Sequence, residues 1–185
     1  MTLDAQRDDI VMKLLAIGFI LVNATPQLEL RATFPGHPEV SEPTGRYKLV
    51  FEEAGQGTPH ELVLVTLATG QATRLISFNR RADVLWGPDG NALAITSWDG
   101  SDFSELFVVQ MDDPSHLVNV AQQLQESFGP MPELVDNHHV YFEALSWIDP
   151  RVLRFKVSGH GANNPDGFEL FFESDLHGPV RKAPA

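Results

Sequence analysis

The sequence predicts a mainly β fold: an antiparallel β-meander of repeated units with one inserted α-helix. Three short segments resemble one another, because residues 61–65 read ELVLV, residues 105–109 read ELFVV and residues 169–173 read ELFFE. An earlier β-like run precedes each segment and is opened by a leucine after a turn. The leucines are Leu49, Leu93 and Leu153, and the turns lie at 43–45, 88–90 and 149–151. Self-similarity at such a period marks a repeat architecture, and 185 residues fit one domain.

The first unit is expected over about 43–78. Residues 25–45 before it contain four prolines and predict an extended lead-in with one short edge strand. Tyr47, Leu49 and Phe51 then alternate with polar or smaller residues, which is a strand signal. The apolar run 62–67 is typical of a strand covered on both faces. A turn and a further strand, ending at Phe78, complete the unit.

The second and third units are expected over 83–113 and 140–182, with a helix over 114–128 between them. In the second unit, Pro-Asp-Gly at 88–90 predicts a turn, since proline fixes one φ, aspartate bonds its own backbone and glycine takes the positive φ. For the helix, Pro114 suits the first turn after Asp113 as N-cap. Apolar residues follow at helical spacing, and Gly129-Pro130 ends the pattern.

The second unit resembles a blade of the TolB-type β-propellers. Residues 85–94 read LWGPDGNALA and are followed by ELFVV, as in a family where a Trp-Ser-Pro-Asp-Gly turn joins the first two strands of a blade. The resemblance is good for 83–113, partial for 43–76 and weak for 143–182. It implies blades of antiparallel strands and binding roles, with no catalytic residues. Propellers close with about 4–8 blades, and only about three are expected here, so the expected fold is an incomplete propeller.

Composition and charge exclude several classes of function. The chain is 43% hydrophobic and 21% charged, which suits a globular core. Its net charge of −12 argues against non-specific nucleic-acid binding and against docking on an anionic membrane. An acidic balance suits solubility by itself, and beyond that it suits a partner protein with a basic surface. The absence of cysteine excludes disulfides, thiolate metal sites and cysteine nucleophiles.

The N-terminal segment 1–24 is expected to be an extension and a signal peptide. Lys13 precedes a short apolar run over 14–22, and small residues follow up to Ala24. The run is shorter than the roughly 20 residues of a membrane-spanning helix. Three aspartates within residues 1–11 do not suit a signal, so Met12 is the expected true start. The mature domain, 25–185, is then expected to be periplasmic or secreted.

One end of the predicted meander collects polar and aromatic loop residues. Alternate connections of an antiparallel meander fall at the same end, which groups loops 53–60, 98–104 and 159–167 with connectors 77–83 and 129–139. Loops on a rigid scaffold commonly carry function. The candidate binding surface therefore comprises Arg80, Arg81, Trp98, Asp99, Asp102, His138, His139, His160, Asn163 and Asp166.

Neither a cofactor nor a metal site is expected on this surface. His138 and His139 could ligate zinc beside Asp136, but adjacent strand residues point in opposite directions, so ordinary histidines are expected. The segment 99–102 has oxygen ligands for calcium without the spacing of a calcium-binding loop. Trp86 and Trp147 share a repeat position and are expected in the core, whereas Trp98 opens a loop and is expected to be exposed.

The sequence thus predicts an exported, non-enzymatic binding protein that uses loops at one end of the meander. The sequence contains no nucleophile elbow, zinc-protease helix motif, phosphate-binding loop or dinucleotide fingerprint, and no catalytic residue is assigned. Two alternatives stay open. One is a small metal-dependent or hydrolytic enzyme whose site would use His138, His139, His160 and Asp166. The other is a structural subunit whose sheet edges pair in a homodimer or larger homo-oligomer.

Overall fold

The computed structural model describes residues 30–53, 55, 57–134, 139–162 and 164–184. These residues form thirteen strands and one helix. The elements are β1 (Arg31–Phe34), β2 (Glu39–Ser41), β3 (Tyr47–Glu52), β4 (His60–Thr66), β5 (Ala72–Phe78), β6 (Arg81–Trp86), β7 (Ala92–Trp98), β8 (Glu105–Gln110), β9 (Leu117–Asn119), α1 (Val120–Phe128), β10 (His139–Asp149), β11 (Val152–His160), β12 (Phe168–Asp175) and β13 (Val180–Lys182).

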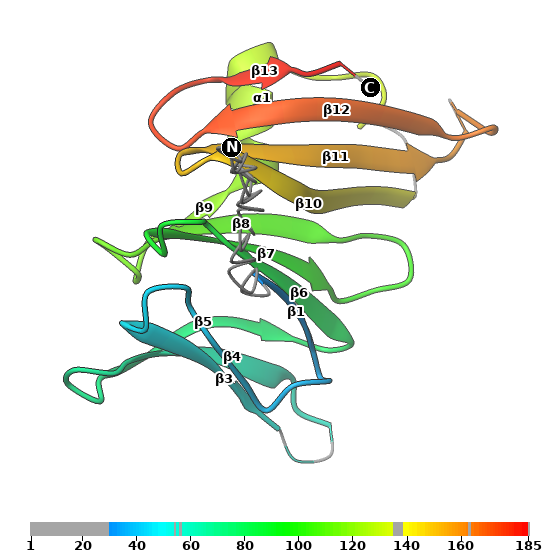
Figure 1. Cartoon of the computed structure of the whole chain (residues 1–185). Helices are drawn as coiled ribbons and strands as arrows, with labels where there is room; N and C mark the ends of the chain where they lie inside the picture. The colour runs from blue at the N-terminus through cyan, green and yellow to red at the C-terminus, as the bar shows by residue number, and fades with distance from the viewer. Residues whose placement is uncertain (1–29, 54, 56, 135–138, 163, 185) are drawn as a thin grey trace, which may run out of the picture.

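The strands form three antiparallel sheets that lie one above another in Figure 1. The first sheet has the order β2-β3-β4-β5, the middle sheet β1-β6-β7-β8-β9 and the third sheet β10-β11-β12-β13. The repeated ELVLV, ELFVV and ELFFE segments fall in β4, β8 and β12, which are the third meander strand of their respective sheets. The predicted fold class is confirmed: mainly β, built from blade-like antiparallel units, with one helix among the described residues.

The lead-in before the first unit departs from the prediction of one edge strand. It contributes two strands to two different sheets, because β2 pairs with β3 while β1 pairs with β6 of the middle sheet. Phe34 at the end of β1 is fully buried. The alternation that indicates a strand was weak here, because both strands are short and prolines lie between them. As a result β1 covers one edge of the middle sheet and ties the first two units together.

The helix begins six residues later than the predicted 114–128. Residues Leu117–Asn119 pair with β8 as strand β9, and the helix starts at Val120. Asn119 is the N-cap, since its side-chain oxygen accepts hydrogen bonds from the backbone N–H groups of Ala121 and Gln122. The predicted end at Phe128 agrees with the structure, with Gly129 as C-cap. Pairing with the edge of β8 therefore outweighed the Asp-Pro start signal.

The middle sheet is packed on both faces. On β7, Leu93 and Ile95 point toward the first sheet, and Ala94 points toward the third sheet and α1. This alternation places one apolar cluster between the first and middle sheets and another between the middle and third sheets. Trp86 lies fully buried in the first cluster, and Trp147 packs against the second and donates its Nε1–H to the Leu85 carbonyl oxygen (3.1 Å).

The outer faces of the first and third sheets carry paired charges instead. On the first sheet, Lys48 pairs with Glu39 (2.7 Å) and Arg74 with Glu61 (2.6 Å). On the third sheet, Lys156 lies 3.3 Å from Glu143 and 3.4 Å from Glu169, and Arg181 pairs with Glu173 (3.3 Å). These cross-strand pairs let both outer faces meet water while the two inner clusters hold the sheets together.

The predicted extension and signal peptide over 1–24 lie outside the described residues. Within the described part of the chain, no helix has the length and apolar character needed to cross a membrane.

Candidate functional site

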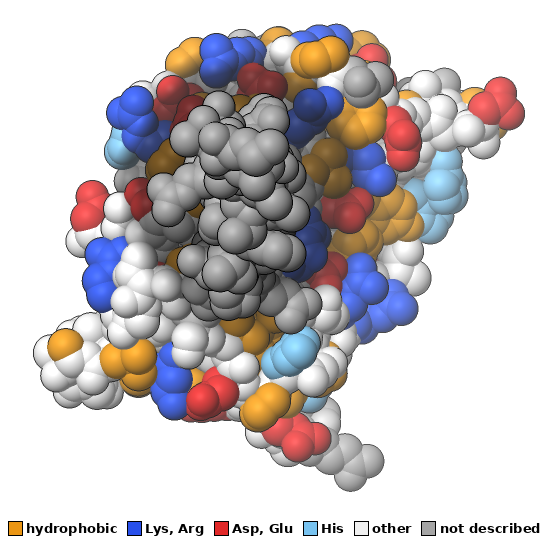
Figure 2. All heavy atoms as spheres, in the orientation of Figure 1, with side chains coloured by type: hydrophobic (Ala, Val, Ile, Leu, Met, Phe, Trp, Pro, Cys, Tyr) orange, Lys and Arg blue, Asp and Glu red, His pale blue; other side chains and the backbone are white. Residues whose placement is uncertain are grey.

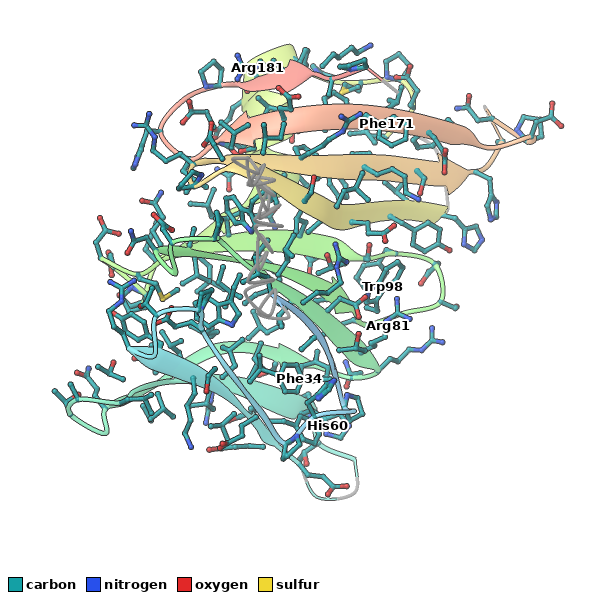
Figure 3. The ribbon with its side chains drawn as sticks, in the orientation of Figure 1. Phe34, His60, Arg81, Trp98, Phe171 and Arg181 are labelled. Atoms are coloured by element: carbon teal, nitrogen blue, oxygen red, sulfur yellow. The ribbon has the colours of Figure 1, made fainter. Side chains whose placement is uncertain are left out.

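The long loops and strand ends of the candidate surface meet at one side of the stack. Figure 3 labels Arg81 and Trp98 at the right-hand side of the middle sheet, beside the adjoining end of the third sheet. The two residues are direct cross-strand partners on β6 and β7. On the face drawn in Figure 2, histidine, hydrophobic and Lys or Arg side chains follow one another along this side. The site is therefore shared by two sheets.

Asp83 organises the part of the site on the middle sheet. Its Oδ1 accepts a hydrogen bond from the Thr33 hydroxyl (2.7 Å), and its Oδ2 accepts one from Trp98 Nε1–H (2.7 Å). Arg81 Nη2 lies 3.1 Å from the same Oδ2. Arg81 and Asp83 are two residues apart on β6 and so face the same side of the sheet. The carboxylate thus fixes both the indole and the guanidinium.

Five planar groups follow one another, at stacked or tilted angles, in a row that crosses from the middle to the third sheet. We call them the stacked row: Arg81, Trp98, Tyr141, His139 and His160. The Arg81 guanidinium carbon lies 4.6 Å from the Trp98 ring centroid, and the Trp98 and Tyr141 centroids are 5.9 Å apart. Tyr141 is 6.4 Å from His139, whose ring stacks on His160 at 4.2 Å. Such aromatic and cation–π contacts hold each side chain in one orientation.

The polar atoms of Tyr141 are bonded inside the molecule. Its hydroxyl donates to the Ser101 carbonyl oxygen (2.8 Å) and lies 3.2 Å from His139 Nδ1. A tyrosine hydroxyl has one proton. Because that proton goes to Ser101, the bond with His139 requires a proton on Nδ1. The Tyr141 ring is therefore held by both the β7–β8 loop and its own strand.

The β7–β8 loop is fastened to the third sheet by backbone bonds. The Val140 N–H donates to the Asp102 carbonyl oxygen (3.1 Å), and the Ser104 N–H donates to the Val140 carbonyl oxygen (3.3 Å). The buried Ser104 hydroxyl donates to the Phe142 carbonyl oxygen (2.8 Å) and accepts from the Phe142 N–H (2.9 Å). These bonds fix the distance between Trp98 and Tyr141, although 43 positions in the sequence separate them.

Arg80 and Asp99 hold the β5–β6 connection against the β7–β8 loop. Arg80 Nη1–H donates to the Gly100 carbonyl oxygen (2.7 Å). Asp99 Oδ1 accepts from the Asn79 N–H (2.8 Å), and its Oδ2 accepts from the Ser97 hydroxyl (3.0 Å). Asp99 is thus occupied by structural bonds, whereas Arg80 retains further N–H groups at the surface.

An open pocket lies at the start of the stacked row, and we call it the Arg–Trp pocket. Its volume is about 440 Å³, and it is lined by Arg80, Arg81, Trp98, Gly100, Ser101 and Tyr141. Two arginines line it, and none of its lining residues in the described part of the chain is acidic. Both aromatic side chains are partly exposed there. The pocket can therefore accept a polar or charged group against an aromatic wall.

The structure brings some of the predicted site residues together and leaves others apart. Arg80, Arg81 and Trp98 line the Arg–Trp pocket, and His139 and His160 extend the row from it. Asp102 lies on the adjoining loop but outside the pocket lining, and Asp166 lies exposed in the β11–β12 connection. His138 and Asn163 lie outside the described residues.

The two described histidines of the enzyme alternative stack face to face and do not converge on one point. His139 and His160 are cross-strand partners with rings inclined by 26°. Among the described residues, no group of three or more His, Cys, Asp or Glu side chains could hold a metal ion. Stacked imidazoles direct their nitrogens sideways, so this pair does not form the ligand geometry that zinc requires.

Sequence reasoning did not identify Asp83, Tyr141 and the backbone of Gly100 and Ser101 as parts of the site. A period-2 signal could have found the first two, because Asp83 follows Arg81 by two residues and Tyr141 follows His139 by two. Gly100 had a weaker signal. A Cβ there would lie 2.5 Å from Asp102 Oδ1 and 3.1 Å from the Phe103 ring, so a larger residue would push these two side chains aside.

The architecture and the site define a class: an incomplete, β-propeller-like stack of three antiparallel sheets with an aromatic and cationic loop surface. Among solved structures, the chain is similar in part to TolB from Acinetobacter baumannii, with 14% sequence identity and a TM-score of 0.42. The similarity covers 80% of this chain and 32% of that protein, so this chain spans about a third of its length. No family model matches the sequence, and no curated protein matches it.

Proposed function

We propose that this chain is an exported, non-enzymatic binding protein that contacts a partner protein through the stacked row and the Arg–Trp pocket. One observation carries the proposal: Trp98 and Tyr141 are partly exposed although their polar atoms are already bonded to Asp83 and Ser101. A partner can therefore contact the faces of these two rings and the exposed guanidinium groups of Arg80 and Arg81. Trp, Tyr and Arg are the residues that most often dominate binding energy at protein interfaces.

The rigidity of the surface supports the same function. The Asp83 bonds hold Trp98, and the bonds of Ser104 hold the loop against the third sheet. Side chains that are already ordered lose little conformational entropy when a partner binds, so more of the contact energy appears as affinity. The exposed Phe103, 42% accessible, adds a further apolar side chain to the same loop.

Overall charge and the N-terminal sequence support the remaining parts of the proposal. A net charge of −12 favours encounter with a protein whose overall surface is basic, because opposite charges accelerate association. The layout of residues 12–24 supports export to the periplasm or beyond. Mass spectrometry of the protein from native cells tests export: a mature N-terminus close to Thr25 is expected, and an intact cytoplasmic chain would contradict it.

Binding is tested with a pair of matched variants. The full chain, the double variant Trp98→Ala/Tyr141→Ala and the control Leu67→Ala are immobilised and exposed to the envelope fraction of native cells. Leu67 is 45% accessible and lies at the β4–β5 turn, at the other end of the strands. Quantitative mass spectrometry then compares retained proteins, and each candidate is purified and titrated directly.

The expected result is a partner that the parent and Leu67→Ala chains bind equally and that the double variant binds at least about tenfold more weakly. Near-ultraviolet circular dichroism confirms that the double variant is folded. A partner whose affinity is the same for all three chains would contradict the proposed surface. A turnover assay with the purified partner that detects chemical change would contradict the non-enzymatic role.

A further inference from the structure

We propose that the Arg–Trp pocket binds a carboxylate, namely an acidic side chain on the surface of the partner protein. This inference rests on the proposed function and assigns the chemistry of its anchor. Among the described residues, the lining contains two arginines and no acidic residue, in a chain whose net charge is −12. The charged side chains that line the pocket are therefore both basic, although the whole chain is acidic and three aspartates lie close behind them.

Within the described ranges, the three aspartates nearest the pocket are either engaged in bonds or outside its lining. Asp83 accepts bonds from Thr33 and Trp98 and pairs with Arg81. Asp99 accepts bonds from Asn79 and Ser97 through both of its oxygens. Asp102 is exposed on the same loop and does not line the pocket. Its charge lowers the affinity of the site for an anion without occupying the arginines.

Arg80 supplies the free donors. Among the described residues, its hydrogen-bond partner is the Gly100 carbonyl oxygen, which engages Nη1 at 2.7 Å. A guanidinium has five N–H groups in a rigid fork, so this bond fixes the group while leaving donors for a ligand. Paired N–H groups match the two oxygens of a carboxylate. Arg81, held over the Trp98 ring at 4.6 Å, is already paired with Asp83 at 3.1 Å, so Arg80 is the main anchor and Arg81 lines the pocket beside it.

The aromatic wall makes the site selective for a carboxylate that is presented by a protein. Trp98 and Tyr141 offer apolar surface to the methylene groups of an Asp or Glu side chain and keep water from one side of the ion pair. A polyanion such as nucleic acid would bring many charges against the acidic chain, whereas one carboxylate on a partner whose overall surface is basic would not. The pocket thus fixes the register of a partner that long-range charge attracts.

The test uses indole nuclear magnetic resonance on the full chain. The three tryptophans, Trp86, Trp98 and Trp147, give three indole N–H signals, and the signal of Trp98 is assigned by its loss in Trp98→Phe. The probes are the capped tripeptides Ac-Ala-Glu-Ala-NH2, Ac-Ala-Gln-Ala-NH2 and Ac-Ala-Lys-Ala-NH2, with inorganic phosphate as a fourth. Only the first probe presents a carboxylate, and its backbone is the same as that of the next two.

The glutamate peptide is expected to shift the Trp98 signal saturably with millimolar affinity, and the glutamine and lysine peptides to leave it unmoved. Arg80→Gln is expected to weaken the affinity about tenfold, and Asp102→Asn to strengthen it about twofold. Arg151→Gln, at an exposed turn elsewhere, is the control and should change nothing. An equal shift with the glutamine peptide or phosphate, or none with the glutamate peptide, would overturn the assignment.

The same variants separate this inference from the proposed function. If partner binding depends on Trp98 and Tyr141 but is unchanged in Arg80→Gln, the partner surface stands and the carboxylate anchor is wrong. If the glutamate peptide binds but the partner is indifferent to all three substitutions, the pocket chemistry stands and the proposed function fails.

Discussion

The two ends of the strand stack use their polar residues in opposite ways. At the loop end, Arg80, Trp98 and Tyr141 keep exposed donors or ring surface after their internal bonds are made. At the turn end, Glu42 is fully buried and all of its bonds serve the fold. Its carboxylate accepts from the Thr44 N–H and hydroxyl (both 2.6 Å) and from the Arg46 N–H (2.5 Å).

The turn end also joins two repeats. Arg46 of the first unit donates Nη2–H to Asn91 Oδ1 (2.8 Å) in the second. Gly90, in the Pro-Asp-Gly turn, lies against Glu42: a Cβ on Gly90 would come 2.1 Å from Glu42 Oε2. The difference between the ends teaches that buried, fully bonded polar groups set stability here, whereas half-exposed ones on a fixed frame are available for binding.

The largest expected effect is that of Glu42→Ala. The substitution removes the buried carboxylate and leaves the part-buried N–H groups of Thr44 and Arg46 without their acceptor, and the free energy of unfolding should fall by about 3 kcal/mol. Urea unfolding followed by tryptophan fluorescence measures it. A loss below about 0.5 kcal/mol would mean that water replaces the carboxylate, and the contrast between the ends would disappear.

A glycine pair sharpens the same point. Gly90 and Gly70 have φ of +69° and +71°, but only Gly90 has a close neighbour, since a Cβ on Gly70 would meet nothing within 4 Å. Gly70→Ala should cost about 1 kcal/mol for the left-handed backbone alone, and Gly90→Ala about 2 kcal/mol or more because Glu42 must also move. If both variants lose the same free energy of unfolding in thermal or urea denaturation, Glu42 can move aside at no cost in stability.

A smaller effect is expected from pH. Burial by itself would raise the pKa of Glu42, but the hydrogen bonds from Thr44 and Arg46 outweigh it and hold the pKa below its ordinary value of 4.5. A lowered folded-state pKa contributes stability that is present above pH 4.5 and lost as pH falls through the folded value. Unfolding curves between pH 7 and pH 3 should therefore show a steeper loss for the parent chain than for Glu42→Gln. Parallel curves would contradict the assignment.

The smallest expected change in stability is at the loop end. Arg80→Gln removes an exposed group with one bond to Gly100, so the free energy of unfolding should change by less than about 0.5 kcal/mol. Partner and peptide binding should still weaken. Urea unfolding and peptide titration on the same sample make the comparison. A stability loss comparable with that of Glu42→Ala would show that the loop end, too, is built for structure.

The sequence predicted the parts of the fold that local patterns encode. Strands β4, β8 and β12 carry the repeated motif, and the Pro-Asp-Gly turn at 88–90 is found where it was expected. The pairing of β1 with β6 was not predictable from local patterns. A four-residue strand carries little signal of its own, and its position depends on tertiary packing such as the burial of Phe34. The later start of α1 is also due to tertiary contacts, because residues 117–119 pair with the edge of β8 as a strand.

The sequence predicted which loops share one end of the strands, but it did not predict the contacts among their side chains. Meander geometry grouped the loops that contain Arg81, Trp98 and His160, because alternate connections share an end. The stacked order depends on the lateral offset between the middle and third sheets, which is set by Ser104 and Phe142. No sequence period encodes that offset, so Tyr141 was overlooked. Whether these residues bind a partner stays a prediction.

The double-sided burial of the middle sheet has a consequence for the order in which the molecule opens. Either outer sheet can detach by exposing one apolar cluster, but the backbone of β7, buried between both, is released only when the two clusters are lost together. Amide hydrogens at Leu93, Ala94 and Ile95 should then exchange with solvent at the rate of global unfolding. Those of β3 and β12 can exchange through partial openings that leave the rest of the stack intact.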